Sequence, residues 1–197
     1  EFTPEKDGIV AGEENTFEVL LRASSDLMRP TSSDKKLPLN LALVLDRSGS
    51  MQGRPLEEAK KCAAMLVDRM SEDDMLSVTT YDNRVDVIIP TTKVVDKSRL
   101  KDRINQINPG GMTALYDGWS IGAEQVAEFA DNNSLSRVLL LSDGQANSGL
   151  TDEETITSHC GTMAENGVTT STYGLGPRFN ENLMSAMATA GQGQSHY

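Results

Sequence analysis

The chain has 197 residues, a formal net charge of −11 and a pI near 4.6. This length suffices for one well-buried core but is short for two full domains. Nucleic acids and anionic membranes attract basic surfaces, so the acidic balance argues against both and favours a protein partner. No apolar run approaches the roughly 20 residues that cross a bilayer, and the first residues lack the order of a signal peptide. We therefore expect a soluble fragment, with a cytoplasmic location slightly favoured over an extracytoplasmic one.

The two cysteines and two histidines give little support for a soft-metal site. Cys62 and Cys160 both fall in helical patterns, where a small buried thiol is the simplest interpretation and a disulfide needs geometry that sequence does not reveal. With His159 and His196 as the imidazoles, neither the ligand count nor the spacing of a Cys/His zinc site is present. We expect two free thiols and no zinc site of that kind.

Residues 1–36 differ from the rest of the chain. The alternation over Thr16–Arg22 predicts one strand whose pairing partner is not obvious, and 30–36 has the composition of a polar linker. The sequence begins with Glu1 and Phe2 rather than Met, which indicates a piece of a longer protein. We expect a β segment and linker over 1–36 and a single domain over 37–197.

Two apolar runs end in an aspartate. Leu39–Leu45 precedes Asp46, and Arg137–Ser142 precedes Asp143. Nearly unbroken apolar runs of this length are typical of parallel strands buried on both faces. Parallel neighbours would bring both carboxylates to the carboxyl edge of the sheet, where open α/β folds bind their ligands.

The other segments alternate between helical and strand-like periodicity. The expected elements, in chain order, are a helix from Pro55 to Met70, an antiparallel edge hairpin of Met75–Tyr81 and Arg84–Ile89 around Asp82-Asn83, a helix capped by Asp96, a helix from Thr113 with Phe129 on its apolar face, a helix that begins at Thr151 with Glu154 completing the cap, a strand over 168–175 and a helix over 181–190. This order predicts an α/β fold with a doubly wound, mostly parallel sheet, one antiparallel edge strand and helices on both faces. A further strand is expected to begin near Ser195, so we expect the fold to be cut short there.

Five oxygen-bearing side chains follow the strand ends and loops of this fold. Carboxylates and hydroxyls are hard donors that suit magnesium, manganese or calcium. Each residue alone has a simpler explanation as a cap or a turn, and the metal site is predicted by the set: Asp46, Ser48, Ser50, Thr113 and Asp143.

Three motifs carry a resemblance to a known family: Asp46-x-Ser48-Gly49-Ser50-Met51, Gly111-Met112-Thr113 and Leu141-Ser142-Asp143-Gly144. Together they resemble the metal-ion-dependent adhesion site of a von Willebrand factor A domain of bacterial type, over roughly 37–197. The resemblance implies a Rossmann-like fold in which the serines and threonine coordinate the ion and the aspartates often act through water. It also implies that the flanking segments form a small β-domain, which would give the first strand its partners.

The charge count of such a site predicts what it binds. Two ionised aspartates roughly neutralise a divalent ion, and neutral hydroxyls leave it electrophilic. An ion that takes about six oxygens would keep a position for water or for a partner's carboxylate. We therefore expect a metal-dependent protein–protein interaction module that binds an Asp or Glu of its partner. Mg²⁺ is the expected ion, with Mn²⁺ and Ca²⁺ as alternatives, and neither nucleic acid nor direct membrane contact is expected.

Two other functions stay open. A Mg²⁺-dependent phosphoaspartyl enzyme would use Asp46 as its nucleophile, but such enzymes usually need a second carboxylate two residues later, where Ser48 stands. A Gly-rich phosphate loop ending in Lys-Ser/Thr is also missing, so we expect no enzyme activity. Alternatively, the ion only orders the loops, and the partner binds the edge hairpin or the N-terminal segment.

Overall fold

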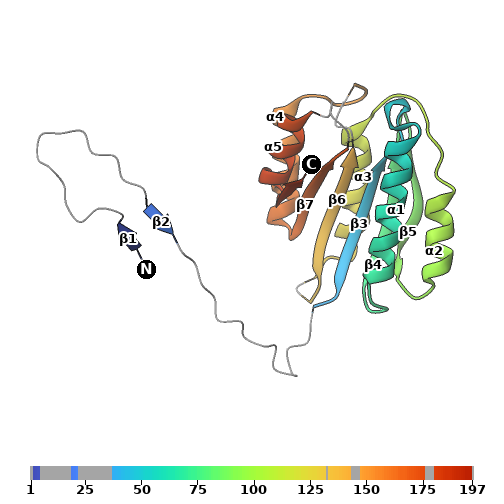
Figure 1. Ribbon diagram of the computed structural model, residues 1–197, viewed down its shortest axis with the longest axis horizontal. Helices are drawn as coiled ribbons and strands as arrows, with labels where there is room; N and C mark the ends of the chain where they lie inside the picture. The colour runs from blue at the N-terminus through green and yellow to red at the C-terminus, as the bar shows by residue number, and fades with distance from the viewer. Residues whose placement is uncertain are drawn as a thin grey trace, which may run out of the picture. The chain divides into compact units, whose positions relative to one another are not determined.

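Figure 1 shows a computed structural model of the chain. The structure describes residues 2–4, 19–21, 37–131, 133–142, 147–175 and 180–196. The chain divides into two compact units, Glu1–Lys36 and Leu37–Tyr197. In the first unit, β1 (Phe2–Pro4) pairs antiparallel with β2 (Val19–Leu21), which lies within the strand predicted over Thr16–Arg22.

The second unit is built on a six-stranded sheet in the order β5-β4-β3-β6-β7-β8. Its strands are β3 (Leu39–Asp46), β4 (Met75–Tyr81), β5 (Val85–Lys93), β6 (Leu135–Ser142), β7 (Val168–Gly174) and β8 (Gln192–His196). Neighbouring strands are parallel except for the antiparallel edge pair β4 and β5. The predicted α/β class and the edge hairpin are confirmed, whereas the last strand begins at Gln192 rather than near Ser195.

Helices cover both faces of the sheet (Figure 1). They are α1 (Arg54–Arg69), α2 (Lys97–Asn105), α3 (Leu115–Ala127), α4 (Glu153–Glu165) and α5 (Glu181–Ala190), with a short 3₁₀ turn, η1, at Gly49–Met51. Side chains of α1 and α2 pack into one apolar cluster, and those of α3, α4 and α5 pack into a second cluster. The predicted doubly wound arrangement is therefore confirmed.

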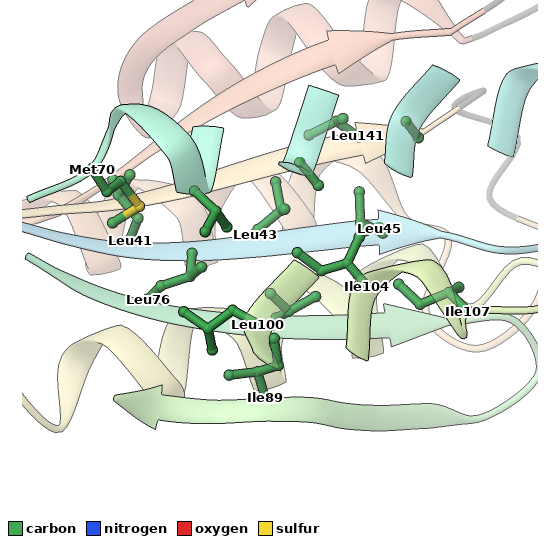
Figure 2. Packing of buried hydrophobic residues seen from close by; sticks show 14 of the residues in the cluster. Leu41, Leu43, Leu45, Met70, Leu76, Ile89, Leu100, Ile104, Ile107 and Leu141 are labelled. Atoms are coloured by element: carbon green, nitrogen blue, oxygen red, sulfur yellow. The ribbon is translucent and has the colours of Figure 1, made fainter. Parts of the chain in front are cut away.

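Strand β3 contributes to both clusters because successive side chains alternate between the faces of a sheet. Leu41, Leu43 and Leu45 point to the first face, and Figure 2 shows them packed with residues of β4 and α2. Ala42 and Val44 point to the second face. Burying one leucine contributes roughly 1.5–3 kcal/mol, so this strand anchors the loop that follows Asp46.

Helix α3 packs against the sheet through two glycines that leave no room for a side chain. A β-carbon at Gly118 would lie 2.4 Å from the ring of Tyr81, and one at Gly122 would lie 2.2 Å from Val44. The predicted apolar face of this helix is confirmed at Trp119 but wrong at Phe129, which lies beyond the helix end and is 42% exposed. The close packing fixes the start of α3, just after Thr113.

The two predicted helix caps differ in outcome. Asp96 caps α2 as expected, because its carboxylate accepts a hydrogen bond from the backbone N–H of Arg99 at 3.0 Å. The cap of α4 is Asp152, which accepts from the N–H of Thr155 at 2.9 Å, so the prediction of Thr151 was wrong by one residue. Aspartate is at least as good an N-cap as threonine, so its position decides where the helix begins.

Both cysteines are free, as expected, but only Cys160 is buried, whereas Cys62 lies exposed on α1. No helix in the described part of the chain combines the length and apolarity needed to cross a membrane.

Candidate metal centre

The carboxyl ends of β3 and β6 lie at the same end of the sheet, because the two strands are parallel neighbours (Figure 1). The register pairs Leu45 with Leu141, so Asp46 and Ser142 are the next residues on two neighbouring parallel strands. The sequence predicts two aspartates at this edge of the sheet. The structure describes Asp46 there, whereas Asp143 lies outside the described residues and its role stays a prediction.

Asp46 is completely buried, and hydrogen bonds fix its carboxylate. Oδ1 accepts the backbone N–H of Ser48 at 2.8 Å. Oδ2 accepts the hydroxyl of Ser142 at 2.7 Å and, more weakly, that of Tyr81 at 3.4 Å. The first bond closes a turn that aspartate readily forms with its own backbone two residues on. The carboxylate is thus held in place before any ion binds.

The two motif serines lie side by side. Their hydroxyl oxygens, on Ser48 and Ser50, are 3.0 Å apart. The 3₁₀ turn η1 brings them together, and the fully buried Met51 anchors this turn in the core. Ser48 is buried whereas Ser50 is exposed, so the pair opens toward solvent on the Ser50 side.

Thr113 is only 2% exposed and is held by backbone hydrogen bonds on both sides. Its N–H donates to the side-chain oxygen of Asn147 at 2.9 Å. Its carbonyl accepts the N–H groups of Asn147 and Ser148, both at 3.2 Å. Asn147 and Ser148 are therefore bound to the loop that carries Thr113.

Two further hydrogen bonds join the Thr113 loop to the loop of the serines. The N–H of Gly49 donates to the carbonyl of Gly111 at 2.7 Å, and the N–H of Gly110 donates to the carbonyl of Arg47 at 2.6 Å. The structure therefore brings Asp46, Ser48 and Ser50 together and binds the loop of Thr113 to them.

Sequence reasoning missed three residues that support this arrangement: Arg47, Ser142 and Asn147. Two of them lie within or next to the predicted motifs. Ser142 directly precedes Asp143 at the strand end, where its register beside Asp46 follows from the parallel pairing. Arg47 stands inside the serine motif, but the sequence does not show which acidic side chains it meets. Asn147 follows the second aspartate by four residues and carries no signal of its own.

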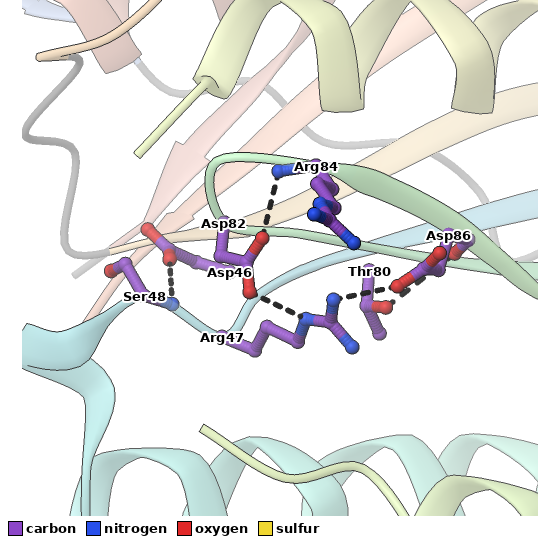
Figure 3. Close-up of polar contacts among 7 residues, drawn as sticks. All are labelled: Asp46, Arg47, Ser48, Thr80, Asp82, Arg84 and Asp86. Carbon is purple, nitrogen blue, oxygen red and sulfur yellow. Dashed lines mark hydrogen bonds and ion pairs between the residues drawn. The ribbon is translucent and has the colours of Figure 1, made fainter. Parts of the chain in front are cut away.

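Arg47 points away from the ligand set. Figure 3 shows its side chain extending from the loop toward Asp82 and Asp86, while Asp46 and Ser48 lie on the other side. Its Nε lies 3.2 Å from a carboxylate oxygen of Asp82, and an Nη lies 2.6 Å from one of Asp86. The positive charge next to the candidate metal site is therefore paired with two carboxylates.

The donor set fits a hard divalent cation. Adjacent oxygens around an octahedral Mg²⁺, with bonds of about 2.1 Å, lie roughly 3.0 Å apart. The hydroxyls of Ser48 and Ser50 have this separation. Within the described ranges, no group of three or more His, Cys, Asp or Glu side chains is placed to hold a metal ion, so a site here relies on hydroxyls as well as carboxylates.

Residues 40–197 match the von Willebrand factor type A domain family. An uncharacterized protein of Synechocystis sp. is 36% identical over 165 residues, which make up 83% of this chain and 38% of that protein. The chain thus spans little more than a third of this relative.

Two solved structures share the fold. One is a von Willebrand factor type A protein from Catenulispora acidiphila, with a TM-score of 0.70 at 18% identity, covering 81% of this chain and 39% of that chain. The other is proximal thread matrix protein 1 from the mussel byssus with a zinc-occupied MIDAS motif. Its TM-score is 0.70 at 20% identity, covering 82% of this chain and 44% of that chain. Because the family match extends over most of the sequence, the chain belongs to the von Willebrand factor type A domain family.

Proposed function

We propose that this domain is a metal-dependent protein-binding module with a complete metal-ion-dependent adhesion site. The proposed ligand set is Asp46, Ser48, Ser50, Thr113 and Asp143, around a divalent cation for which Mg²⁺ is the first choice. The ion would supply one open coordination position, which a carboxylate of the partner occupies. Domains of this family typically act as metal-dependent adhesion or interaction modules.

The observation that carries the proposal is the pair of hydroxyls at 3.0 Å, beside a carboxylate fixed by hydrogen bonds. A preformed set of ligands lowers the ordering cost of binding an ion. Ser50 lies at the exposed side of the pair, so an ion there would be reachable by a partner. In the mussel protein the corresponding kind of site holds zinc, which adds Zn²⁺ to the ions worth testing.

The charge balance supports a carboxylate as the partner's contribution. The chain carries a net charge of −11, which repels acidic proteins at a distance. A divalent ion held by two carboxylates and neutral hydroxyls retains the local attraction for a third carboxylate. Binding of an acidic side chain should therefore require the ion.

A phosphoaspartyl enzyme is disfavoured by the environment of Asp46. The nucleophile of such an enzyme must reach a phosphoryl group. Here the carboxylate is 0% exposed, and each of its oxygens accepts a hydrogen bond from the chain. The residue two positions later is Ser48, which has no carboxylate to act as acid or base. We propose a binding role without turnover.

A second candidate function rests on a groove of about 530 Å³ between β5 and α2, which contains none of the proposed metal ligands. Lys93, Arg99 and Arg103 line it, opposed by the single carboxylate of Asp96. In this alternative an acidic peptide binds in the groove, and the ion only orders the loops around it. This binding would survive a chelator and would weaken in Arg99→Ala.

We also propose that the domain spans 37–197, and that 1–36 belongs to a flanking β-domain. The division of the chain at Lys36 supports this boundary, as does the antiparallel pairing of β1 with β2.

The test is selection from a random-peptide display library on the immobilised chain in Mg²⁺. Peptides that carry an Asp or Glu should be enriched, and they should dissociate in EDTA. Changing that residue to Asn or Gln should abolish binding, as should Asp46→Ala in the domain. Enriched peptides that bind equally well in EDTA would contradict the proposal, and their loss in Arg99→Ala would favour the groove.

A further inference from the structure

Arg47 stands between two proposed ligands, yet its side chain contacts other parts of the chain. Only 18% of this side chain is exposed. Its two ion pairs differ, because the side chain of Asp82 is 8% exposed and that of Asp86 is 51% exposed. Exposed pairs contribute little to geometry, whereas a buried pair is costly to break. The guanidinium makes its hydrogen bond to Asp86, but the ion pair with Asp82 is the more buried of the two, and we expect Asp82 to be the partner that matters structurally.

Asp82 is itself held from several directions (Figure 3). Its second carboxylate oxygen accepts the N–H of Arg84 at 2.7 Å, and its own N–H donates to the carbonyl of Arg84 at 2.9 Å. Its carbonyl accepts the N–H of Ala114, the residue directly after Thr113, at 2.8 Å. A rigid turn thus connects Arg47 to the far side of Thr113.

The near side of Thr113 is connected to Arg47 as well. Gly110 donates its N–H to the carbonyl of Arg47 at 2.6 Å. It also lies against Asp82 so closely that a β-carbon would be 1.7 Å from the carboxylate. The loop from Gly110 to Ala114 is therefore fixed at one end by the backbone of Arg47 and at the other end by the backbone of Asp82, the ion-pair partner of the Arg47 side chain.

We propose that Arg47 is a positioning residue of the metal site. Through its buried pair with Asp82, it sets the Thr113 loop against the loop of Ser48 and Ser50 before an ion binds. Pairing with two carboxylates also neutralises a guanidinium that would otherwise repel a nearby cation. The inference rests on the proposed function for its consequence, which is tighter binding of the ion.

The first arm of the test needs no metal. Amide hydrogen exchange is measured by NMR in EDTA for the wild type, for Arg47→Met and for Arg54→Met. Arg54 is the matched control because it pairs with Glu58 on α1, and its side chain is 88% exposed. Arg47→Met should speed exchange at Gly49, Gly110 and Ala114 by about tenfold or more, while the amides of β3 remain protected. Exchange in Arg47→Met equal to that in Arg54→Met would overturn the inference.

The second arm measures Mg²⁺ affinity by calorimetry. Arg47→Met should weaken binding by about tenfold, the range for residues that orient metal ligands. In a Thr113→Ala background the same change should have no further effect, because Arg47 acts through the Thr113 loop. Independent effects that multiply in the double variant would contradict this role.

Two variants keep the test decisive if Arg47→Met does not fold. Arg47→Lys retains the charge but loses the fork that spans both carboxylates, and it should show intermediate exchange. Asp86→Asn removes only the exposed partner and should change the exchange at Ala114 by less than about twofold. A wild type that binds no Mg²⁺ would contradict the proposed function, and the exchange arm would still decide whether Arg47 holds the loops.

Discussion

The loop after β3 has two sides that differ in chemistry. On one side, Asp46 contributes a carboxylate, and Ser48 and Ser50 contribute two neutral hydroxyls whose oxygens lie 3.0 Å apart. On the other side, the guanidinium of Arg47 lies within 3.2 Å of Asp82 and 2.6 Å of Asp86. The first side has donors that suit a cation, whereas on the second side the positive charge is already paired with carboxylates. We propose that the first side binds the ion and that the second sets the geometry of the site.

The largest expected effect comes from removing the carboxylate on the binding side. Asp46→Ala should weaken Mg²⁺ binding by more than about 100-fold, since even residues that only orient ligands cost 10- to 100-fold. Calorimetric titration measures this, with Asp102→Ala on α2 as the control for loss of one exposed charge. An Asp46→Ala protein that binds Mg²⁺ within threefold of the wild type would mean that the ion lies elsewhere.

Substitutions among the carboxylates that pair with Arg47 should lower the stability of the domain and leave the proposed metal ligands in place. Asp82→Asn removes the buried partner of Arg47 and should destabilise the domain by about 1–3 kcal/mol, as expected for a buried charged group left with a poorer partner. Asp86→Asn removes the exposed partner and should cost less than about 1 kcal/mol. Urea unfolding of both variants checks the difference, and equal costs would show that burial of Asp82 is unimportant.

Much of this comparison follows from the sequence, because local patterns determine the strands and the serine loop. The apolar run before Asp46 predicts β3, and the parallel neighbour predicts the strand edge at Ser142. The pairing of Arg47 with Asp82 is different, because it joins a motif residue to a turn 35 positions away. Nothing in the spacing specifies that contact, and the same holds for Asn147 and Thr113. Side-chain contacts between loops depend on the packed fold and not on local periodicity.

A smaller effect is expected from the exposed hydroxyl on the binding side. Ser50→Ala should weaken Mg²⁺ binding by about tenfold. Because Ser50 is exposed, the free energy of unfolding in EDTA should change by less than about 0.5 kcal/mol. Ser98→Ala, at an exposed position of α2, is the matched control. A loss of stability without a loss of Mg²⁺ affinity would show that Ser50 supports the loop and does not bind the ion.

The smallest effect is expected in the reactivity of the two thiols. Their labelling rates show whether a substitution loosens only the loops or opens the whole domain. Burial raises the pKa of the Cys160 thiol to about 12, so at pH 8 only about one molecule in ten thousand carries its thiolate. The thiolate of Cys160 appears only as the pH rises toward this value, so Cys160 should not react with a thiol reagent at pH 8. Cys62 lies exposed and should react. Asp82→Asn should leave the ratio of the two labelling rates unchanged. Fast labelling of Cys160 in this variant would indicate global opening instead of a loosened loop.

The most direct measurement is the anomalous scattering of Mn²⁺ in crystals of the chain grown with that ion. A single peak is predicted beside Ser48 and Ser50, with both hydroxyl oxygens at about 2.2 Å, Asp46, Thr113 and Asp143 around it, and one position held by water or a neighbouring carboxylate. A peak remote from the serines, or no peak in millimolar Mn²⁺, would contradict the proposal that this edge of the sheet holds the ion.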